Sequence, residues 1–135
     1  MTAIICLDEK NGMMFNKRRQ SRDSVLNERI LKLAMGKRLL MSEYSAKLFG
    51  ENDAVTVALD PISAASGDDF CFIEGKVTSL ANIDTLCIAL WNRHYPADVF
   101  FDLDIKKEGF RLVSVEEFAG SSHEKITLNI YNKEG

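Results

Sequence analysis

Hydrophobic residues come in short continuous runs separated by polar breaks, and one long segment has a helical period. Thr2–Leu7 is a run of the kind found in strands buried on both faces of a sheet. From Ser21 to Met35, apolar residues recur at spacings near four and seven, which predicts a helix capped by Ser21 or Asp23 and ended by Gly36. The pattern also predicts six further strands and three short helices: strands Arg38–Met41, Ala54–Leu59, Phe70–Ile73, Thr85–Asn92, Phe110–Phe118 and Lys125–Tyr131, and helices Glu43–Phe49, Ile62–Ser66 and Val77–Ile83.

The order of these elements predicts the fold class. Strands alternate with helices at first, and the last strands follow one another, which indicates an α/β domain with three layers. We expect a mixed, mostly parallel sheet flanked by helices, with antiparallel C-terminal strands. Thr2–Leu7 is expected at its centre and Lys125–Tyr131 near an edge. The length of 135 residues fits one domain, spanning 1–135.

Composition is that of an ordinary globular protein, with 46% hydrophobic and 27% charged residues. Apolar runs fall far short of the ~20 residues that span a bilayer, and the N-terminus lacks a secretory-signal pattern. We therefore expect a cytoplasmic protein with no membrane partner. Cys6, Cys71 and Cys87 each lie in an apolar run without a CxxC motif, which indicates core residues rather than disulfides or ligands.

Charge is distributed unevenly along the chain. Residues 1–38 hold nine Lys/Arg against four Asp/Glu, and the remainder holds eight against sixteen, so the two parts carry +5 and −8. The acidic balance argues against nucleic acid as a partner. The cations in the loop before the long helix are nevertheless candidate contacts for an anion or a protein partner, or simply a solvated surface, and are expected to be exposed: Lys17, Arg18, Arg19 and Arg22.

The connection between the first strand and the long helix is the candidate binding region, because a long, half-apolar connection often forms a small-molecule site. Asp23 can accept two parallel donors from a ligand, and flexible methionines suit a lid. The candidate substrate-binding residues are Cys6, Met13, Met14, Phe15 and Asp23. Two alternatives stay open: Asp23 as an ordinary helix cap, and Met13–Phe15 as the apolar underside of a loop.

The collinear order of several segments resembles the dihydrofolate reductase family over nearly the full length. The segments that carry the resemblance are Ile4–Asp8, Asn11–Met13, Asp23, Leu40–Glu43, Phe72–Gly75, Ala81–Ile88, Phe100–Asp102, Phe110–Phe118 and Ser121–Ile126. The resemblance implies the family's mixed sheet and a nicotinamide cofactor. It also makes Asp23 the match to the carboxylate that contacts substrate, and therefore the one candidate catalytic residue.

Departures from the family's pattern weaken the activity that it implies. Ser42-Glu43 stands where the family has Gly-Arg, and Glu74-Gly75 where it has paired glycines. A pyrophosphate needs bare backbone N–H groups and positive charge, so NADPH is unlikely and no cofactor is expected. We expect a protein without reductase activity that binds a small anionic metabolite or a protein partner through the basic loop and a residual cleft. The alternative is an NAD(P)H-dependent reductase of a pterin-like substrate, with Asp23 as the polarising acid.

His94 and His123 are the only histidines. A ribonuclease Z-type nuclease needs an HxHxDH cluster and further histidines, so that function is rejected for lack of metal ligands. A Ser-His-Asp site would require distant residues to converge, which the sequence cannot establish. The segment around His123 is instead predicted to turn the chain into its last strand. Trp91 is predicted to be a buried indole at a strand end.

Overall fold

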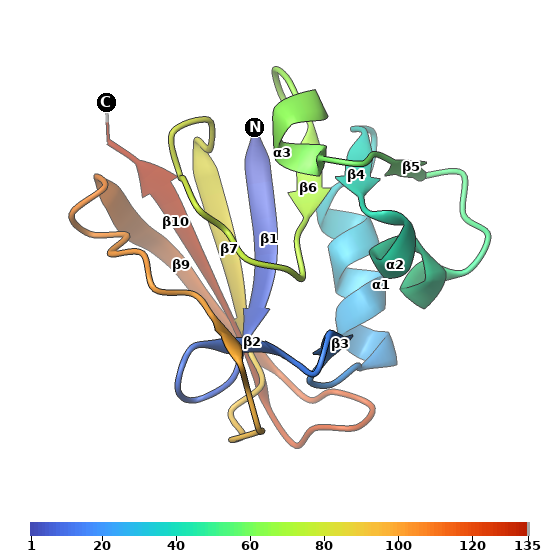
Figure 1. Cartoon of the computed structure of the whole chain (residues 1–135), viewed down its shortest axis with the longest axis vertical. Helices are drawn as coiled ribbons and strands as arrows, with labels where there is room; N and C mark the ends of the chain where they lie inside the picture. Colours follow the sequence, from blue (N-terminus) through green and yellow to red (C-terminus); the bar gives the residue numbers. More distant parts are fainter. Residues whose placement is uncertain (135) are drawn as a thin grey trace.

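A seven-stranded mixed sheet forms the body of the computed structural model, which describes residues 1–134 (Figure 1). Its order is β5-β4-β6-β1-β7-β10-β9. The five strands from β5 to β7 are parallel, and β10 runs antiparallel to both of its neighbours. The bounds are β1 Thr2–Leu7, β4 Leu39–Met41, β5 Val55–Val57, β6 Phe70–Phe72, β7 Thr85–Leu90, β9 Phe110–Phe118 and β10 Ile126–Lys133. The predicted fold class, the central place of the first strand and the antiparallel ending are confirmed.

The alternation of side chains along β1 divides the interior into two cores. Ala3 and Ile5 face one core and Ile4 faces the other, because successive residues of a strand point to opposite faces. The core around Ile4 is covered by α1 (Ser24–Leu33). The core around Ile5 is covered by α3 (Pro61–Ala64) and by irregular chain between the strands (Figure 1).

The helices begin at side-chain caps. Asp23 caps α1 by accepting from the backbone N–H groups of Val25 and Leu26, so the cap alternative for Asp23 is confirmed. Ser42 caps α2 (Glu43–Ala46), which continues as a 3-10 turn over Lys47–Phe49. The helix expected over 77–83 is not formed. Three of its apolar side chains are buried against the sheet from irregular chain instead: Val77, Leu80 and Ile83.

A second, three-stranded sheet lies at the carboxyl end of β1 and was not predicted (Figure 1). It consists of β3 (Arg18–Arg19), β2 (Gly12–Phe15) and β8 (Val99–Phe100). These strands are too short for an alternating pattern to stand out. Two of its strands, β2 and β3, belong to the candidate binding region between β1 and α1.

The cysteines are free, as predicted for core residues: Cys71 and Cys87 are buried, and Cys6 is half-buried. Burial raises the pKa of Cys71 and of Cys87 to about 11, so neither thiol ionises readily. Trp91 is buried, as predicted. Among residues 1–134, no helix combines the length and apolar character needed to cross a membrane.

Candidate functional site

One hollow lies where the parallel strands β4, β5 and β6 end. Ligands of open α/β sheets bind at this edge, outside the carboxyl ends of the strands. The hollow has a volume of about 490 Å³, within the range of small-molecule sites. We call it the sheet-edge cleft, and its lining residues are Met14, Lys17, Ser42, Tyr44, Ser45, Leu59, Asp60, Pro61, Ile62, Phe72, Ile73, Glu74, Gly75 and Lys76. Its walls are mainly apolar, with a few polar groups that can orient a ligand.

An ion pair neutralises the carboxylate at the inner end of the cleft. Arg19 donates from Nε and Nη2 to the two oxygens of Glu74, at 2.7 and 2.9 Å. Ser45 Oγ donates to the same carboxylate at 2.8 Å, and the Arg19 guanidinium stacks over the ring of Tyr44. The sequence suggested that Glu74 carries an unpaired negative charge. In the structure, Arg19 and Ser45 satisfy that carboxylate. The expected exposure holds for Lys17, Arg18 and Arg22 but not for Arg19, which this pairing half-buries.

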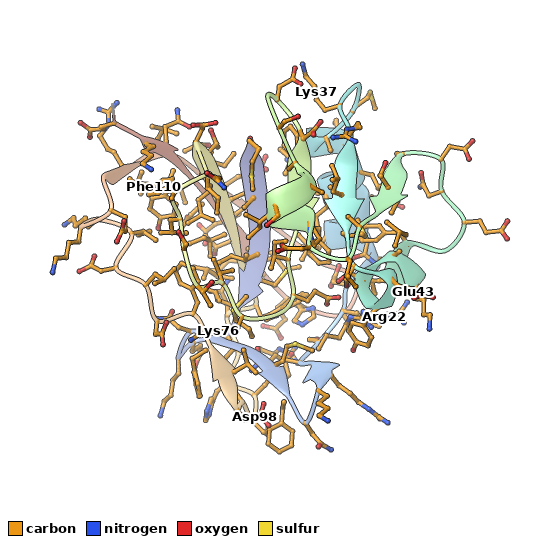
Figure 2. All side chains as sticks on the ribbon, turned by 45° about the horizontal axis from the view of Figure 1, so that its top comes forward. Arg22, Lys37, Glu43, Lys76, Asp98 and Phe110 are labelled. Carbon is orange, nitrogen blue, oxygen red and sulfur yellow. The ribbon has the colours of Figure 1, made fainter. Side chains whose placement is uncertain are left out.

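Lys17 brings a cation to the cleft from a strained turn. Asn16 and Lys17 form the two-residue turn between β2 and β3, with φ of 52° and 62°. Glycine is favoured in such a turn, because a side chain at positive φ costs roughly 1–2 kcal/mol. Lys17 makes no ion pair with the rest of residues 1–134, whereas the other lysine of the cleft, Lys76, is paired with Asp102. Figure 2 shows Lys76 beside the small sheet, where it also donates to the carbonyl of Phe100 at 2.7 Å.

Asp23 is fully occupied by the protein itself. One carboxylate oxygen accepts from the backbone N–H groups at the start of α1 and from that of Ser121. The other accepts from the N–H of Ser122 at 2.8 Å and faces Nδ1 of His123 at 2.9 Å. Gly120 makes this packing possible, since a Cβ there would lie 2.8 Å from Asp23 Cγ. We call this arrangement the Asp23 network.

The Asp23 network holds a buried charge. Burial raises the pKa of Asp23, but the hydrogen bonds from His123, Ser122 and Ser121 outweigh it and hold the pKa well below its usual value. Five donors use the roughly four lone-pair positions of a carboxylate. Asp23 therefore has no acceptor left for a pterin-like ligand in this conformation.

Little open space remains beside Ser21 and Trp91. Trp91 stacks on His123 with ring centroids 4.6 Å apart. A cavity of about 10 Å³ remains there, with walls that include Cys6, Met13 and Ser21. That volume holds about one water molecule, so a substrate cannot enter without movement of these side chains.

The candidate site residues are distributed over several places rather than gathered in one. Cys6 and Met13 line the 10 Å³ cavity, and Met14 and Lys17 line the sheet-edge cleft. Another hollow, of about 320 Å³, is lined by Phe15, Asn16, Arg18, Arg19, Gln20, Tyr95 and Pro96. Met13 belongs to the core, so it lies on the apolar underside of the loop, while Phe15 is 48% exposed.

Several residues of these sites were missed by sequence reasoning. Tyr44, Ser45 and Ile62 line the cleft from segments that read only as short helices. His123 was assigned to a turn, and it does lie in the connection before β10. Its partner Asp23 lies 100 residues away, so no local spacing could reveal the pair. Among residues 1–134, no three His, Cys, Asp or Glu side chains are grouped as metal ligands would be.

Comparisons with known proteins give the fold and not a family. No family model matches the sequence, and no curated protein sequence matches it. Among solved structures, the chain is similar to a dihydrofolate reductase from Enterococcus faecalis in complex with NADP(H) and RAB-propyl. The TM-score is 0.70 over 99% of this chain and 96% of that one, at 12% sequence identity. The chain therefore has a dihydrofolate reductase-like fold.

Proposed function

We propose that this protein has no reductase activity and binds a small anionic organic molecule in the sheet-edge cleft. The observation that carries the proposal is a contrast between two places. The cleft at the ends of β4, β5 and β6 is open at about 490 Å³, whereas the cavity lined by Ser21 and Trp91 holds about 10 Å³.

The chemistry of the cleft favours an amphipathic anion. Its apolar wall, which includes Ile62 and Phe72, suits a flat or aliphatic body. Lys17 is the cation left for an anionic group, since Glu74 and Lys76 already have partners of opposite charge. A lysine kept at a strained turn position is expected where its side chain serves a ligand.

The alternative, a reductase that uses a nicotinamide cofactor, is supported by the NADP(H) complex of the similar enzyme. The Arg19–Glu74 pair also removes one of the two repulsive charges that argued against a dinucleotide. Against it, Asp23 has no free acceptor for a pterin-like substrate. Glu43 remains exposed at the start of α2, and Figure 2 shows it at the surface. We expect NADPH to bind much more weakly than a working reductase requires.

Calorimetric titration tests the proposal. The ligands are NADPH, ADP and a set of aromatic carboxylates, measured with the native protein and with Lys17→Gln. A contact with a partly solvated lysine contributes about 1 kcal/mol, so Lys17→Gln should weaken binding about fivefold. Lys10→Gln is the matched control, because Lys10 is exposed in another turn. Failure of every anion to bind, or binding that Lys17→Gln leaves unchanged, contradicts the proposal. Micromolar NADPH binding together with turnover of dihydrofolate would favour the reductase.

A further inference from the structure

Two side chains just before α1 and a third from about a hundred residues later form a hydrogen-bonded series. Ser21 Oγ lies 3.0 Å from Nε2 of His123, and Nδ1 of the same ring lies 2.9 Å from Oδ2 of Asp23. Ser21 is half-buried, while His123 and Asp23 are buried. These are the distances of a nucleophile, a base and an orienting carboxylate.

The partners of the imidazole determine where its proton lies. Asp23 is ionised and can only accept, so Nδ1 carries the hydrogen and donates it to that carboxylate. Nε2 is then left with a free lone pair. Two hydroxyls face that lone pair: Ser21 Oγ, and the Tyr95 hydroxyl at 3.1 Å. Stacking on Trp91 fixes the plane of the ring. The base is therefore oriented toward the serine before any ligand arrives.

We propose that Ser21 is a nucleophile for the hydrolysis of esters with short acyl groups. Ser21 Oγ forms a bond to the acyl carbon while its proton passes to Nε2 of His123. The tetrahedral species expels the alcohol oxygen, which takes that proton and leaves as the alcohol. Water then attacks the acyl-serine, with His123 again accepting the proton and returning it to Ser21 Oγ. The products are the carboxylic acid and the free enzyme.

Tyr95 is placed to stabilise the charge that develops in this reaction. Its hydroxyl lies 3.4 Å from Ser21 Oγ and 3.1 Å from Nε2 of His123. When Ser21 donates to Nε2, the Tyr95 O–H is free to donate to the oxygen of the tetrahedral species. A tyrosine hydroxyl in this position serves the purpose of an oxyanion-hole donor.

The volumes beside Ser21 set the size of the substrate. The cavity that Ser21 itself lines holds about 10 Å³, which limits the acyl part to a formyl or acetyl group with small side-chain adjustments. Arg19 and Gln20 also line the neighbouring hollow of about 320 Å³, together with Tyr95. That hollow can take the alcohol part, and Arg18 on its wall favours an anionic one. This proposal does not depend on the function proposed for the sheet-edge cleft.

Labelling with a small fluorophosphonate, followed by peptide mass mapping, tests the proposal on the native protein. We expect one label on Ser21, and none on the other serines. Ser66→Ala is the matched control, because Ser66 is exposed and far from this network in the sequence, and it should label as the native protein does. His123→Gln should reduce the labelling rate at least a hundredfold, and Tyr95→Phe should reduce it by roughly ten- to a hundredfold while leaving Asp23 and His123 in place.

Turnover of 4-nitrophenyl esters supplies a second readout. The acetate should be hydrolysed at least tenfold faster than the hexanoate, and Ser21→Ala should abolish the difference. Circular dichroism of each variant separates loss of chemistry from loss of fold. An unlabelled Ser21 in the native, folded protein overturns the proposal, and so does a label that His123→Gln leaves unchanged.

Discussion

Asp23, which the resemblance matches to a substrate-binding carboxylate, provides a test of whether that residue is structural in this protein. Asp23→Asn keeps the size of the side chain and one acceptor oxygen. The new amide can take two orientations. Its N–H₂ group faces the N–H of Ser122 and Nδ1 of His123 in one, and the three N–H groups around the other oxygen in the second. In each orientation a hydrogen-bond donor faces other donors. In the first arrangement two hydrogen bonds to a charged group are lost.

The magnitude follows from those two bonds. Each hydrogen bond to a charged group contributes about 1.5–3 kcal/mol, so the gross loss is roughly 3–6 kcal/mol. A change of tautomer at His123 lets its Nδ1 accept from the amide and recovers part of that loss. We therefore expect a net loss of about 3 kcal/mol in the free energy of unfolding, and a Tm lower by about 10 °C.

Guanidinium unfolding followed by the fluorescence of Trp91, the single buried tryptophan, measures this loss. Asp98→Asn is the matched control. Asp98 is exposed and accepts one backbone N–H, from Asn16, and Figure 2 shows it beside the small sheet. Its change should be below about 1 kcal/mol. An Asp23→Asn protein as stable as the native one, or more stable, refutes the reasoning, because carboxylates held for a ligand strain the free protein.

Four further outcomes follow from the same contacts. Asp8 and Asp23 both have a lowered pKa in the folded protein, because their hydrogen bonds outweigh burial. Their contribution to stability is therefore present above about pH 4 and is lost as the pH falls below that value. Unfolding midpoints measured from pH 7 to pH 2 test this, and midpoints that do not change with pH contradict it. Lys17→Gly should raise the free energy of unfolding by up to about 1 kcal/mol while weakening anion binding, and destabilisation would show that the turn is not strained. Arg19→Met should destabilise by about 1–3 kcal/mol by leaving Glu74 unpaired, and Arg19→Met with Glu74→Leu should recover most of it in a double-mutant cycle. Gly120→Ala should destabilise strongly by displacing Asp23, so a Tm within 2–4 °C of the native value, as measured by calorimetry, contradicts the close approach.

The fold was predictable because its main signals are local. The continuous apolar run of Thr2–Leu7 marks a strand buried on both faces, and β1 has that place. The cap at Asp23 and the apolar spacing after it predicted α1 to within a few residues. The helix predicted over 77–83 was wrong, because three buried side chains at near-helical spacing need not be joined by helical hydrogen bonds. Strands as short as β3 and β8 carry no period at all.

The candidate sites were less predictable, because their residues converge from distant segments. The roles of Arg19 and Glu74 depend on a contact across 55 positions, so the sequence predicted that the four cations of the basic loop are mostly exposed. Asp23 has the sequence context of both a cap and a ligand contact. The contacts of Ser121, Ser122 and His123 with its carboxylate decide between these two roles, and these contacts come from a distant segment. Lys17 was identified as a cation, but its strained turn is a property of backbone angles alone.

The central claim is that ligands bind at the sheet-edge cleft, while the cavity lined by Ser21 and Trp91 is too small for them. The most direct measurement is an NMR titration of the 15N-labelled protein with NADPH, ADP and the aromatic carboxylates. The claim predicts that amide shifts move at Lys17, Tyr44 and Gly75, around the cleft. Shifts confined to Trp91 and Ser122, beside Asp23, or no shift with any of these anions, would contradict it.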